Sequence, residues 1–528
     1  MTKTSEKRLT NFQYRVKFHF VIVNAENLVN KYRAYPAKLR QRQPEMDFPI
    51  MSNPILILLA IFIPVAGAFL LPIAGHFSRR LRNMLALIFI ASSFVLSLLM
   101  IPAVMSGKVI TIIERLPFGF NFSFAADGLA VFMACVSSLV SSIIVFYSFS
   151  YISHYEHQSE YYFMVTLFLG SMIGLIFSAN LLFIYLFWEI TALCSWRLIG
   201  FFREKHYVLK ADKAFLMTFF GAVCMLIGFL LIGLKVGSFE LSVIKEVLKN
   251  NPVSSLVVGL ILVGILSKSA TLPFQSWLPD AGVAPSPVTA LLHAAVLVKI
   301  GVYVYARLFV ATFDIPYIWH TIVPVIAGVS ALISAGCALI ETDLKRIIAY
   351  STISQIGFIF LGLSLNVEIG IVGGLLYILM HGLSKAGLFL CAGIIEQNTK
   401  TKDITKMGGL IRTMPFTAAA FLFCAFSVMG IPPFGGFFSK YLVFGAAVSN
   451  GNMWITSMFL IGAFMTVIYL FRVFNLVFMG TPTAAPVKEG SGTMIFSVLS
   501  LGILSLLGGI LIYYPFKFAE VAMAGFVR

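Results

Sequence analysis

Seven ionisable side chains lie inside stretches of sequence that are otherwise apolar. They comprise one carboxylate, four lysines and two histidines: Glu189, Lys268, His293, Lys299, His381, Lys385 and Lys440. A charge at the centre of a lipid bilayer costs about 2.5–3.5 kcal/mol on insertion scales, so such residues usually face a protein interior and serve a function. Histidine titrates near neutrality, and desolvation can bring a lysine there, so the set predicts a buried proton relay.

The acid and the first lysine are predicted to form a pair. Glu189 has no other acid near it in the sequence, and Lys268, beside a proline-interrupted segment, is the best candidate for its partner. A carboxylate within about 4–6 Å keeps a buried lysine charged, so movement of the partner would switch the lysine between holding and releasing a proton. A static structural ion pair is the alternative interpretation.

The other five residues extend the relay. His381 and Lys385 are four residues apart and share one helix face. His293 and Lys299 are separated by about 9 Å along a helix axis, so they mark different depths. Lys440 would form the outer end. The histidines lack carboxylate or cysteine partners at ligand spacing, so no metal site is predicted, and histidines that only satisfy buried hydrogen bonds are the alternative.

The composition requires a membrane protein. Of 528 residues, 59% are hydrophobic and only 11% are charged, with a mean hydropathy of +0.93. A soluble protein carries about 25% charged residues. The composition therefore excludes a soluble enzyme, a disordered chain and a secreted disulfide scaffold. It predicts a multi-pass helical membrane protein. We expect this protein in a bacterial or archaeal cytoplasmic membrane.

The apolar runs predict an all-α polytopic fold with about fourteen transmembrane helices. We expect these spans at residues 54–75, 84–105, 127–152, 161–178, 180–202, 213–235, 254–278, 286–309, 318–340, 345–364, 368–396, 415–447, 454–479 and 493–514. The short connections leave no room for a soluble domain between spans. No stretch resembles a nucleotide-binding fold, so ATP hydrolysis by this chain is not expected.

Basic residues in alternate loops predict the orientation. One set of loops holds fifteen Lys/Arg and the opposite set holds six, and the richer set is expected to be cytoplasmic. With fourteen spans both termini then lie outside. The first 50 residues conflict with this placement, because they hold ten Lys/Arg against four acids and such a basic segment prefers the cytoplasm. Two interpretations stay open: residues 1–53 are an extension that docks on a partner, or translation starts at Met51.

Two of the predicted spans are interrupted by proline. The interruptions are SKSATLP (267–273) and GIPPFGG (430–436), and each lies in a set of five spans that begins on the opposite side from the other set. Interrupted helices at matching places in inverted halves indicate ion pathways near the membrane midplane. We therefore divide the chain into an extension (1–53), three helices (54–152), a first inverted repeat (153–312), a second (313–480), and a last helix with a tail (481–528).

Neither nucleic acid nor a bound cofactor is expected. The net charge of +16 resides in the first 50 residues and in short loops, without a basic-aromatic groove. The six cysteines fall singly in or beside apolar runs without C-x-x-C spacing, which favours neither an iron–sulfur cluster nor a zinc site.

Five segments resemble the antiporter-like subunits of respiratory complex I, membrane-bound hydrogenases and multisubunit Mrp sodium/proton antiporters. They are KSATLPFQSWLPDA (268–281), APSPVTALLHAA (284–295), DLKRIIAYSTISQ (343–355), HGLSKAGLFL (381–390) and GIPPFGGFFSK (430–440). The resemblance covers about residues 54–514. It implies fourteen core helices with two inverted five-helix repeats.

The resemblance also implies residue roles. It assigns the ion pair to Glu189 on helix five and Lys268 on helix seven. It assigns the relay to three further helices: His293 and Lys299 on helix eight, His381 and Lys385 on helix eleven, and Lys440 on helix twelve. The pair Trp188-Glu189 is similar to the largest complex I type, but the chain ends soon after the last span, without that type's long lateral helix. A hydrogenase-type complex or another complex I relative is expected to fit the shorter chain better.

The leading hypothesis is a proton-translocating subunit of a redox-driven, complex I-related pump of the NADH:quinone oxidoreductase or hydrogenase kind. Its partners would be other membrane subunits and hydrophilic redox subunits, and only those partners would carry iron–sulfur, nickel or flavin groups. The alternatives are a subunit of an Mrp-type Na⁺/H⁺ antiporter and a non-conducting scaffold. The sequence leaves open whether sodium or protons couple the cycle and which enzyme activity, if any, drives it.

Overall fold

Long apolar runs form the long helices of this chain. The computed structural model describes residues 53–115, 121–249, 251–481 and 488–525, and twelve helices in these ranges are long and apolar enough to cross a membrane. Eleven are α2 (Ile55–Phe77), α3 (Arg79–Met105), α4 (Gly128–Tyr151), α5 (Gln158–Phe177), α6 (Leu181–Ile199), α7 (Lys205–Val236), α13 (Trp319–Ile340), α14 (Leu344–Ser364), α15 (Glu368–Thr399), α18 (Met453–Phe478) and α19 (Gly492–Ile510). The nearly all-helical polytopic fold predicted from the composition is confirmed.

The twelfth helix, Ser286–Val310, departs from regular α-helical geometry twice. It consists of α11 (Ser286–Ala290), the π-helical turn η4 (Leu291–Ala295), α12 (Leu297–Tyr305) and the π-helical turn η5 (Ala306–Val310). Single π turns inside helices are rare and frequently occur at functional sites.

The two proline-containing spans are interrupted as predicted. One consists of α9 (Ser255–Lys268) and the four-residue α10 (Trp277–Asp280), and the other of α16 (Pro415–Met429) and α17 (Gly435–Ser449). A helix of 14 or 15 residues is about 22 Å long, short of a hydrocarbon core of about 30 Å, so neither half crosses alone. The count of fourteen spans therefore stays a prediction.

Both interruptions carry special backbone geometry. Ala270 has a φ of 52° and Gly430 a φ of 81°, and each interruption contains a cis prolyl bond. Side chains donate to carbonyl oxygens at both breaks: Trp277 Nε1 donates to Ser267 O at 3.0 Å, and the Lys440 ammonium donates to Val428 O at 2.7 Å. Broken backbone at membrane depth is tolerated where protein covers it, as these contacts do.

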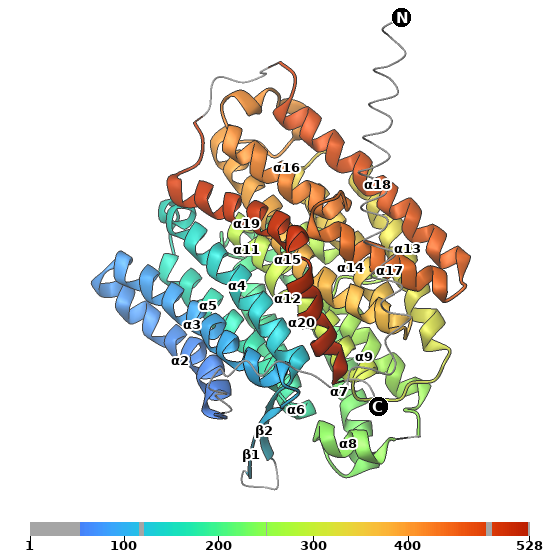
Figure 1. Cartoon of the computed structure of the whole chain (residues 1–528). Coiled ribbons are helices and arrows are strands. Elements are labelled where there is room, and N and C mark those ends of the chain that lie inside the picture. The colour runs from blue at the N-terminus through green and yellow to red at the C-terminus, as the bar shows by residue number, and fades with distance from the viewer. Residues whose placement is uncertain (1–52, 116–120, 250, 482–487, 526–528) are drawn as a thin grey trace, which may run out of the picture. The chain divides into compact units, whose positions relative to one another are not determined.

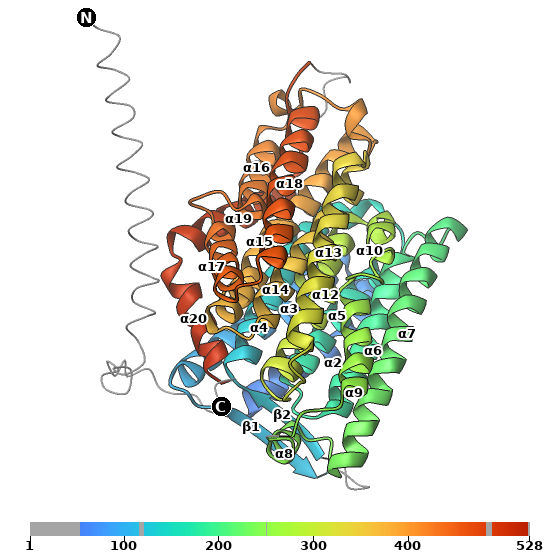
Figure 2. The ribbon, with the colours of Figure 1, turned by 90° about the vertical axis from the view of Figure 1, so that its right-hand side faces the viewer.

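The most buried helices lie at the centre of the bundle. The helices differ in the share of their apolar stretch that is buried inside the protein. This share is 100% in the helix Ser286–Val310 and 94% in α14 and α15, against 28% in α3 and 33% in α18. In Figure 1, α12 lies near the centre of the bundle, while α2 and α18 lie at opposite edges. Figure 2 shows α7 running beside α9, and α13 beside α18. Side chains on the three central helices are therefore shielded from lipid by other helices.

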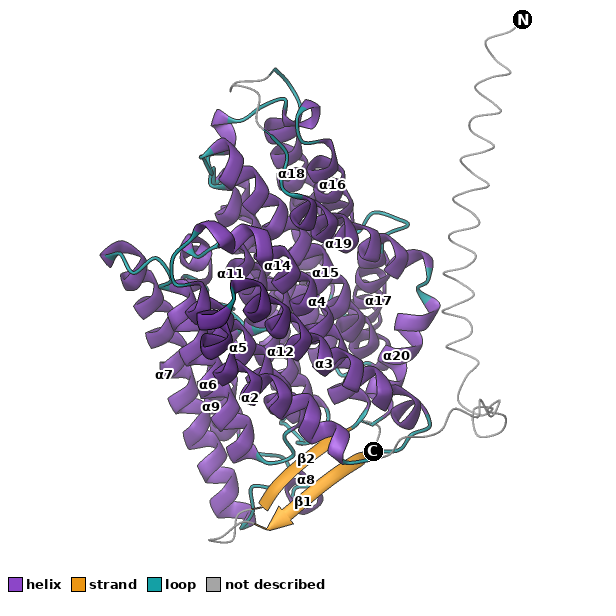
Figure 3. Cartoon of the chain, turned by 90° about the vertical axis from the view of Figure 1, so that its left-hand side faces the viewer, coloured by secondary structure: helices purple, strands orange, loops and turns teal. Residues whose placement is uncertain are grey.

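A short strand pair is the one feature among the described residues that the all-α prediction did not include. Strands β1 (Ile110–Arg115) and β2 (Asn121–Ala126) pair antiparallel, with Ile110 opposite Ala126. They lie at one end of the bundle with the short helix α8 (Leu241–Val247), as Figure 3 shows. After the last long helix, α20 (Tyr513–Ala524) packs on α4. The predicted extension at residues 1–53 falls, except for residue 53, outside the described residues.

Candidate functional site

Lys268 lies where α9 ends at the first interruption. Its side chain is fully buried, and its ammonium donates to the carbonyl oxygen of Trp188 at 3.1 Å and lies 5.0 Å from the centroid of the indole ring. Glu189, the next residue of α6, is half-buried, and its Oε1 has no hydrogen-bond partner among the described residues. The fold thus brings Glu189 and Lys268 to neighbouring helices. The nearest contacts of the Lys268 ammonium are to the backbone and ring of Trp188, and the charges of Glu189 and Lys268 lie close enough to attract each other. Their role as a pair stays a prediction.

Lys299 joins two of the predicted histidines at the centre of the bundle. All three side chains are at most 1% exposed. The Lys299 ammonium donates to the backbone carbonyl of His293 at 3.3 Å and contacts Nδ1 of His381 on α15. The sequence predicted that His293 and Lys299 mark different depths, but it did not predict that Lys299 and His381 meet across two helices.

The π turn η4 explains how Lys299 reaches back to His293. At its end Val296 has φ −123° and ψ −77°, outside the helical region. This break rotates the residues after Val296 relative to those before it. Lys299, six residues after His293, can therefore reach the backbone carbonyl of His293. His293 itself packs its ring against Phe389 of α15 with 4.4 Å between centroids, and neither ring nitrogen has a partner among the described residues.

Lys385 contacts α14 rather than its neighbour on the same helix. Its ammonium donates to the Ser351 hydroxyl at 2.5 Å and to the Ile348 carbonyl at 3.3 Å. The Tyr469 hydroxyl of α18 donates to Ser351 at 2.7 Å and lies 3.3 Å from Thr466 Oγ1. His381 and Lys385 thus share α15, as predicted, but they face different partners.

The same polar network leads toward Lys440 and back to His381. Gln355 donates to Thr466 Oγ1 at 3.1 Å and accepts from the Tyr377 hydroxyl at 2.6 Å. The Tyr377 ring lies 5.8 Å from the Lys440 ammonium, and its centroid lies 6.0 Å from that of His381. Tyr377 therefore lies between the Lys299–His381 contact and the last lysine.

Lys440 closes the second interruption from α17. Its ammonium donates to the carbonyl oxygen of Val428 at 2.7 Å and lies 4.7 Å from the Phe358 ring. The side chain is 4% exposed. Nearby, a methyl group on Gly436 would overlap the carbonyl oxygen of Ser427. The two half-helices therefore approach as closely as their backbones allow.

Five polar residues of this network were not singled out from the sequence. They are Ser351, Gln355, Tyr377, Thr466 and Tyr469, and all are buried. Two of them, Ser351 and Gln355, belong to the segment 343–355 that carries the family resemblance, so a hydrogen-bonding side chain inside an apolar span was the available signal. The tyrosines gave none, because tyrosine is common in membrane helices.

At the ends of the membrane-spanning segments, carboxylates pair with cations. Arg307 donates to Asp127 with two nitrogens, at 2.5 and 2.8 Å, and ties the end of the helix Ser286–Val310 to the start of α4. Burial alone would raise the pKa of Asp127, but the Arg307 charge and hydrogen bonds outweigh it and lower that pKa. Asp127 also accepts from the Ala130 N–H and thereby caps the start of α4.

A second carboxylate holds the loop after the first interruption. Asp280 pairs with Lys213 at 2.7 Å and with Arg346 at 2.8 Å. Partial burial favours a raised pKa for Asp280, yet these two partners lower it below its usual range. In the described parts of the chain no group of three or more His, Cys, Asp or Glu residues could hold a metal ion.

Comparison with known proteins agrees with the fold of an antiporter-like membrane subunit. Residues 178–466 match the model of the transmembrane region of the NADH:quinone oxidoreductase/Mrp antiporter family, and residues 114–162 match that of the N-terminus of complex I chain 5. The chain belongs to the NADH:quinone oxidoreductase/Mrp antiporter family.

Individual relatives lie in the Mrp branch. The chain is 32% identical over 489 residues to the Na⁺/H⁺ antiporter subunit A1 of Staphylococcus haemolyticus, covering 86% of this chain and 61% of that protein. It is 33% identical over 494 residues to the same subunit of Staphylococcus saprophyticus, with the same coverage. It thus spans about 61% of the length of these relatives.

Two solved structures share the fold. A chain of the Mrp complex from Dietzia sp. DQ12-45-1b superposes with a TM-score of 0.82 at 21% identity, covering 90% of this chain and 97% of that one. A chain of an archaeal membrane-bound sulfane sulfur reductase superposes with a TM-score of 0.84 at 24% identity, covering 90% and 98%.

Proposed function

We propose that this chain is a proton-translocating, antiporter-like subunit of a multisubunit membrane complex. The observation that carries the proposal is the central line of buried bases, in which Lys299 contacts His381 and Tyr377 lies between His381 and Lys440. Charged groups this deep in a membrane protein are costly and typically mark ion pathways. A scaffold subunit would have no need of them.

In the proposed path, protons move along the seven predicted residues. Glu189 and Lys268 occupy one end, Lys299 with the two histidines the centre, and Lys385 and Lys440 the other end. The hydroxyl and amide groups of Ser351, Tyr469, Gln355 and Tyr377 would extend the path between the bases by hydrogen bonds. No cofactor is assigned to this chain, and any iron–sulfur, nickel or flavin group would belong to partner subunits.

Its relatives favour an Mrp-type Na⁺/H⁺ antiporter as the complex. The two staphylococcal proteins carry that name at 32 and 33% identity. A redox-driven pump is the second candidate, since the chain is as similar in fold to a subunit of a respiratory sulfur reductase complex. In both, this subunit would work beside other membrane subunits, and in the second also beside hydrophilic redox subunits.

Two experiments test the proposal. Proton uptake by everted vesicles that contain the complex should be lost in Lys268→Ala and Glu189→Gln, with the complex still assembled, and unchanged uptake in both variants would contradict the relay. Purification of the tagged chain in mild detergent, followed by protein and metal analysis, separates the two kinds of complex. Iron with hydrophilic redox subunits would indicate a redox-driven pump, and nickel a hydrogenase. Small membrane partners without metal would indicate the antiporter.

A further inference from the structure

A cavity of about 740 Å³ opens at one end of the bundle. Its walls come from the end of α4, the end of α15 and the loop before α19, with Tyr151, Glu396, Lys402 and Glu489 among the lining residues. The loop after α4, the loop after α15 and the loop before α19 all belong to the set of loops with more Lys/Arg. This is the set predicted to face the cytoplasm. None of the seven relay residues lines this cavity.

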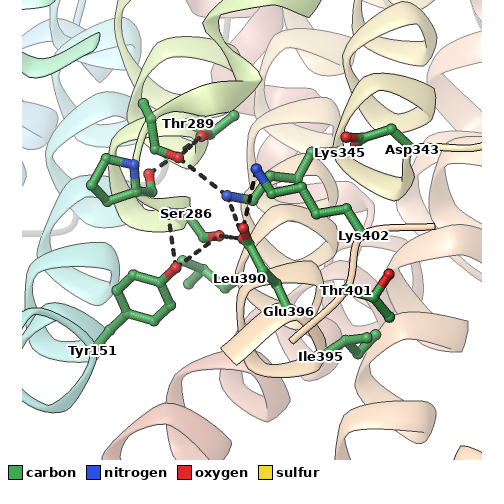
Figure 4. A network of polar contacts seen from close by, with 12 residues as sticks. Tyr151, Ser286, Thr289, Asp343, Lys345, Leu390, Ile395, Glu396, Thr401 and Lys402 are labelled. Carbon is green, nitrogen blue, oxygen red and sulfur yellow. Dashed lines mark hydrogen bonds and ion pairs between the residues drawn. The ribbon is translucent and has the colours of Figure 1, made fainter. Parts of the chain in front are cut away.

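Two charged residues that line the cavity, Glu396 and Lys402, form a cluster with Lys345, which lies buried behind them; we call these three the Glu396 cluster. The Glu396 carboxylate pairs with Lys345 at 2.6 Å and with Lys402 at 3.1 Å, as Figure 4 shows. Lys345 is 2% exposed and also donates to the backbone carbonyl of Ala284 at 3.1 Å. The cluster therefore ties together α14, α15 and the segment that leads into the helix Ser286–Val310.

Ser286 lies directly beneath the cluster. Its hydroxyl lies 3.5 Å from Glu396 Oε2 and 3.4 Å from the Tyr151 hydroxyl, and Figure 4 shows Ser286 between these two side chains. Ser286 is fully buried and is the first residue of α11. A group that passes the Glu396 cluster thus arrives at the start of the helix that carries His293 and Lys299.

Two facing helices carry polar residues from the Glu396 cluster to the relay. On α15, Lys385 precedes Glu396 by eleven residues, which is about three turns or roughly 16 Å on the same side of the helix. Between them Phe389 packs on the ring of His293. On the other helix, His293 follows Thr289 by one turn. His293 is also the relay residue with two unpartnered ring nitrogens in the described structure.

We propose that the cavity is the aqueous entrance of the translocation path on the face with more basic loops, and that the Glu396 cluster closes it. This rests on the proposed function. With Glu396 held by both lysines, Ser286 is sealed from the cavity. Separation of Glu396 from Lys345 opens the way along Ser286 and Thr289 to His293, and Phe389 forms the last apolar barrier.

Thiol accessibility tests the entrance without any transport assay. In vesicles of defined orientation that contain the complex, a small cationic methanethiosulfonate is added to one face at a time of a Ser286→Cys variant, with the parent chain as the background for its native cysteines. We expect slow labelling from the face with more basic loops and none from the other. Adding Glu396→Gln should raise the labelling rate about tenfold, because the neutral amide no longer holds both lysines.

Matched controls give this result its meaning. Glu489→Gln changes a carboxylate on the same cavity wall that accepts from the Thr417 N–H, so it should leave the rate unchanged. Thr401→Cys at the rim should be labelled quickly in every background. Where Ser286→Cys fails to fold, Thr289→Cys serves as the deeper reporter.

Two outcomes would overturn the entrance: labelling of the buried cysteine from the opposite face, or a rate that Glu396→Gln does not change. Failure of the proposed function would look different. Proton uptake would then persist in Lys268→Ala and Glu189→Gln, while the labelling pattern would still report whether the cluster closes the cavity.

Discussion

Replacement of Lys299 by methionine should separate transport from stability. Lys299 is fully buried, and the described residues include no carboxylate paired with it. Removing the ammonium leaves Nδ1 of His381 without a partner, which costs about 1–3 kcal/mol. It also removes a charge whose burial in a membrane costs about 2.5–3.5 kcal/mol. We therefore expect the stability of Lys299→Met to lie between about 0.5 kcal/mol below and about 2.5 kcal/mol above that of the parent.

Transport should nevertheless be lost, because methionine can neither bind nor release a proton. The assay measures proton uptake by everted vesicles through quenching of a pH-sensitive dye, at equal amounts of assembled complex. Stability is measured in detergent as the fraction of complex that survives heating. Lys235→Met is the matched control, because Lys235 is exposed at the end of α7, and it should change neither quantity.

Two results would refute this reasoning. Normal uptake by Lys299→Met would remove the residue from the path. A large loss of thermal stability, with uptake falling only as the assembled complex falls, would show that the lysine serves packing. A structural lysine predicts the second result, whereas the relay predicts intact complexes that do not transport.

Three further predictions concern the frame around the path. Asp127→Asn should lower thermal stability by about 3–5 kcal/mol, because it leaves the Arg307 charge partly buried and unpaired; an unchanged melting curve would contradict this. Asp280 has a lowered pKa in the folded chain, so its stabilising effect is present above the ordinary carboxyl pKa and is lost as pH falls through the folded value. Asp280→Asn should therefore flatten the decline of stability below about pH 4, measured by heating at a series of pH values. Gly436→Ala should reduce assembly because its methyl group meets backbone, while Gly445→Ala, with open space around it, should not, as size-exclusion profiles would show.

The sequence predicted the helices and the buried bases well for one reason. The length of an apolar run determines whether a helix can cross a membrane, and an ionisable residue in such a run is visible without any structure. Six of the seven predicted residues are accordingly buried, and Glu189 is half-buried. The interruptions also lie where proline and glycine predicted them.

Contacts between helices could not be predicted in the same way. The contact of Lys299 with His381 joins positions 82 residues apart, and the Asp127–Arg307 pair joins positions 180 apart. Such pairs depend on how helices pack, which hydropathy does not encode. The π turn η4 could not be predicted either, because the helix Ser286–Val310 is buried on all sides and its apolar pattern therefore has no face that a rotation would shift. For the same reason the sequence predicted Glu189 as the partner of Lys268 but not the hydrogen bond from Lys268 to the backbone of Trp188.

If protons follow the proposed path, the contact between Lys299 and His381 determines how many positive charges its centre can hold. When Lys299 is an ammonium, Nδ1 of His381 must accept, so the imidazole is neutral. Two positive charges about 4 Å apart would repel by about 4 kcal/mol even at an effective dielectric constant of 20. The pair therefore carries one proton at a time. The next proton can load only after the previous one has moved on, and traffic through the centre is single file, with the order of arrivals kept by charge repulsion rather than by a moving barrier.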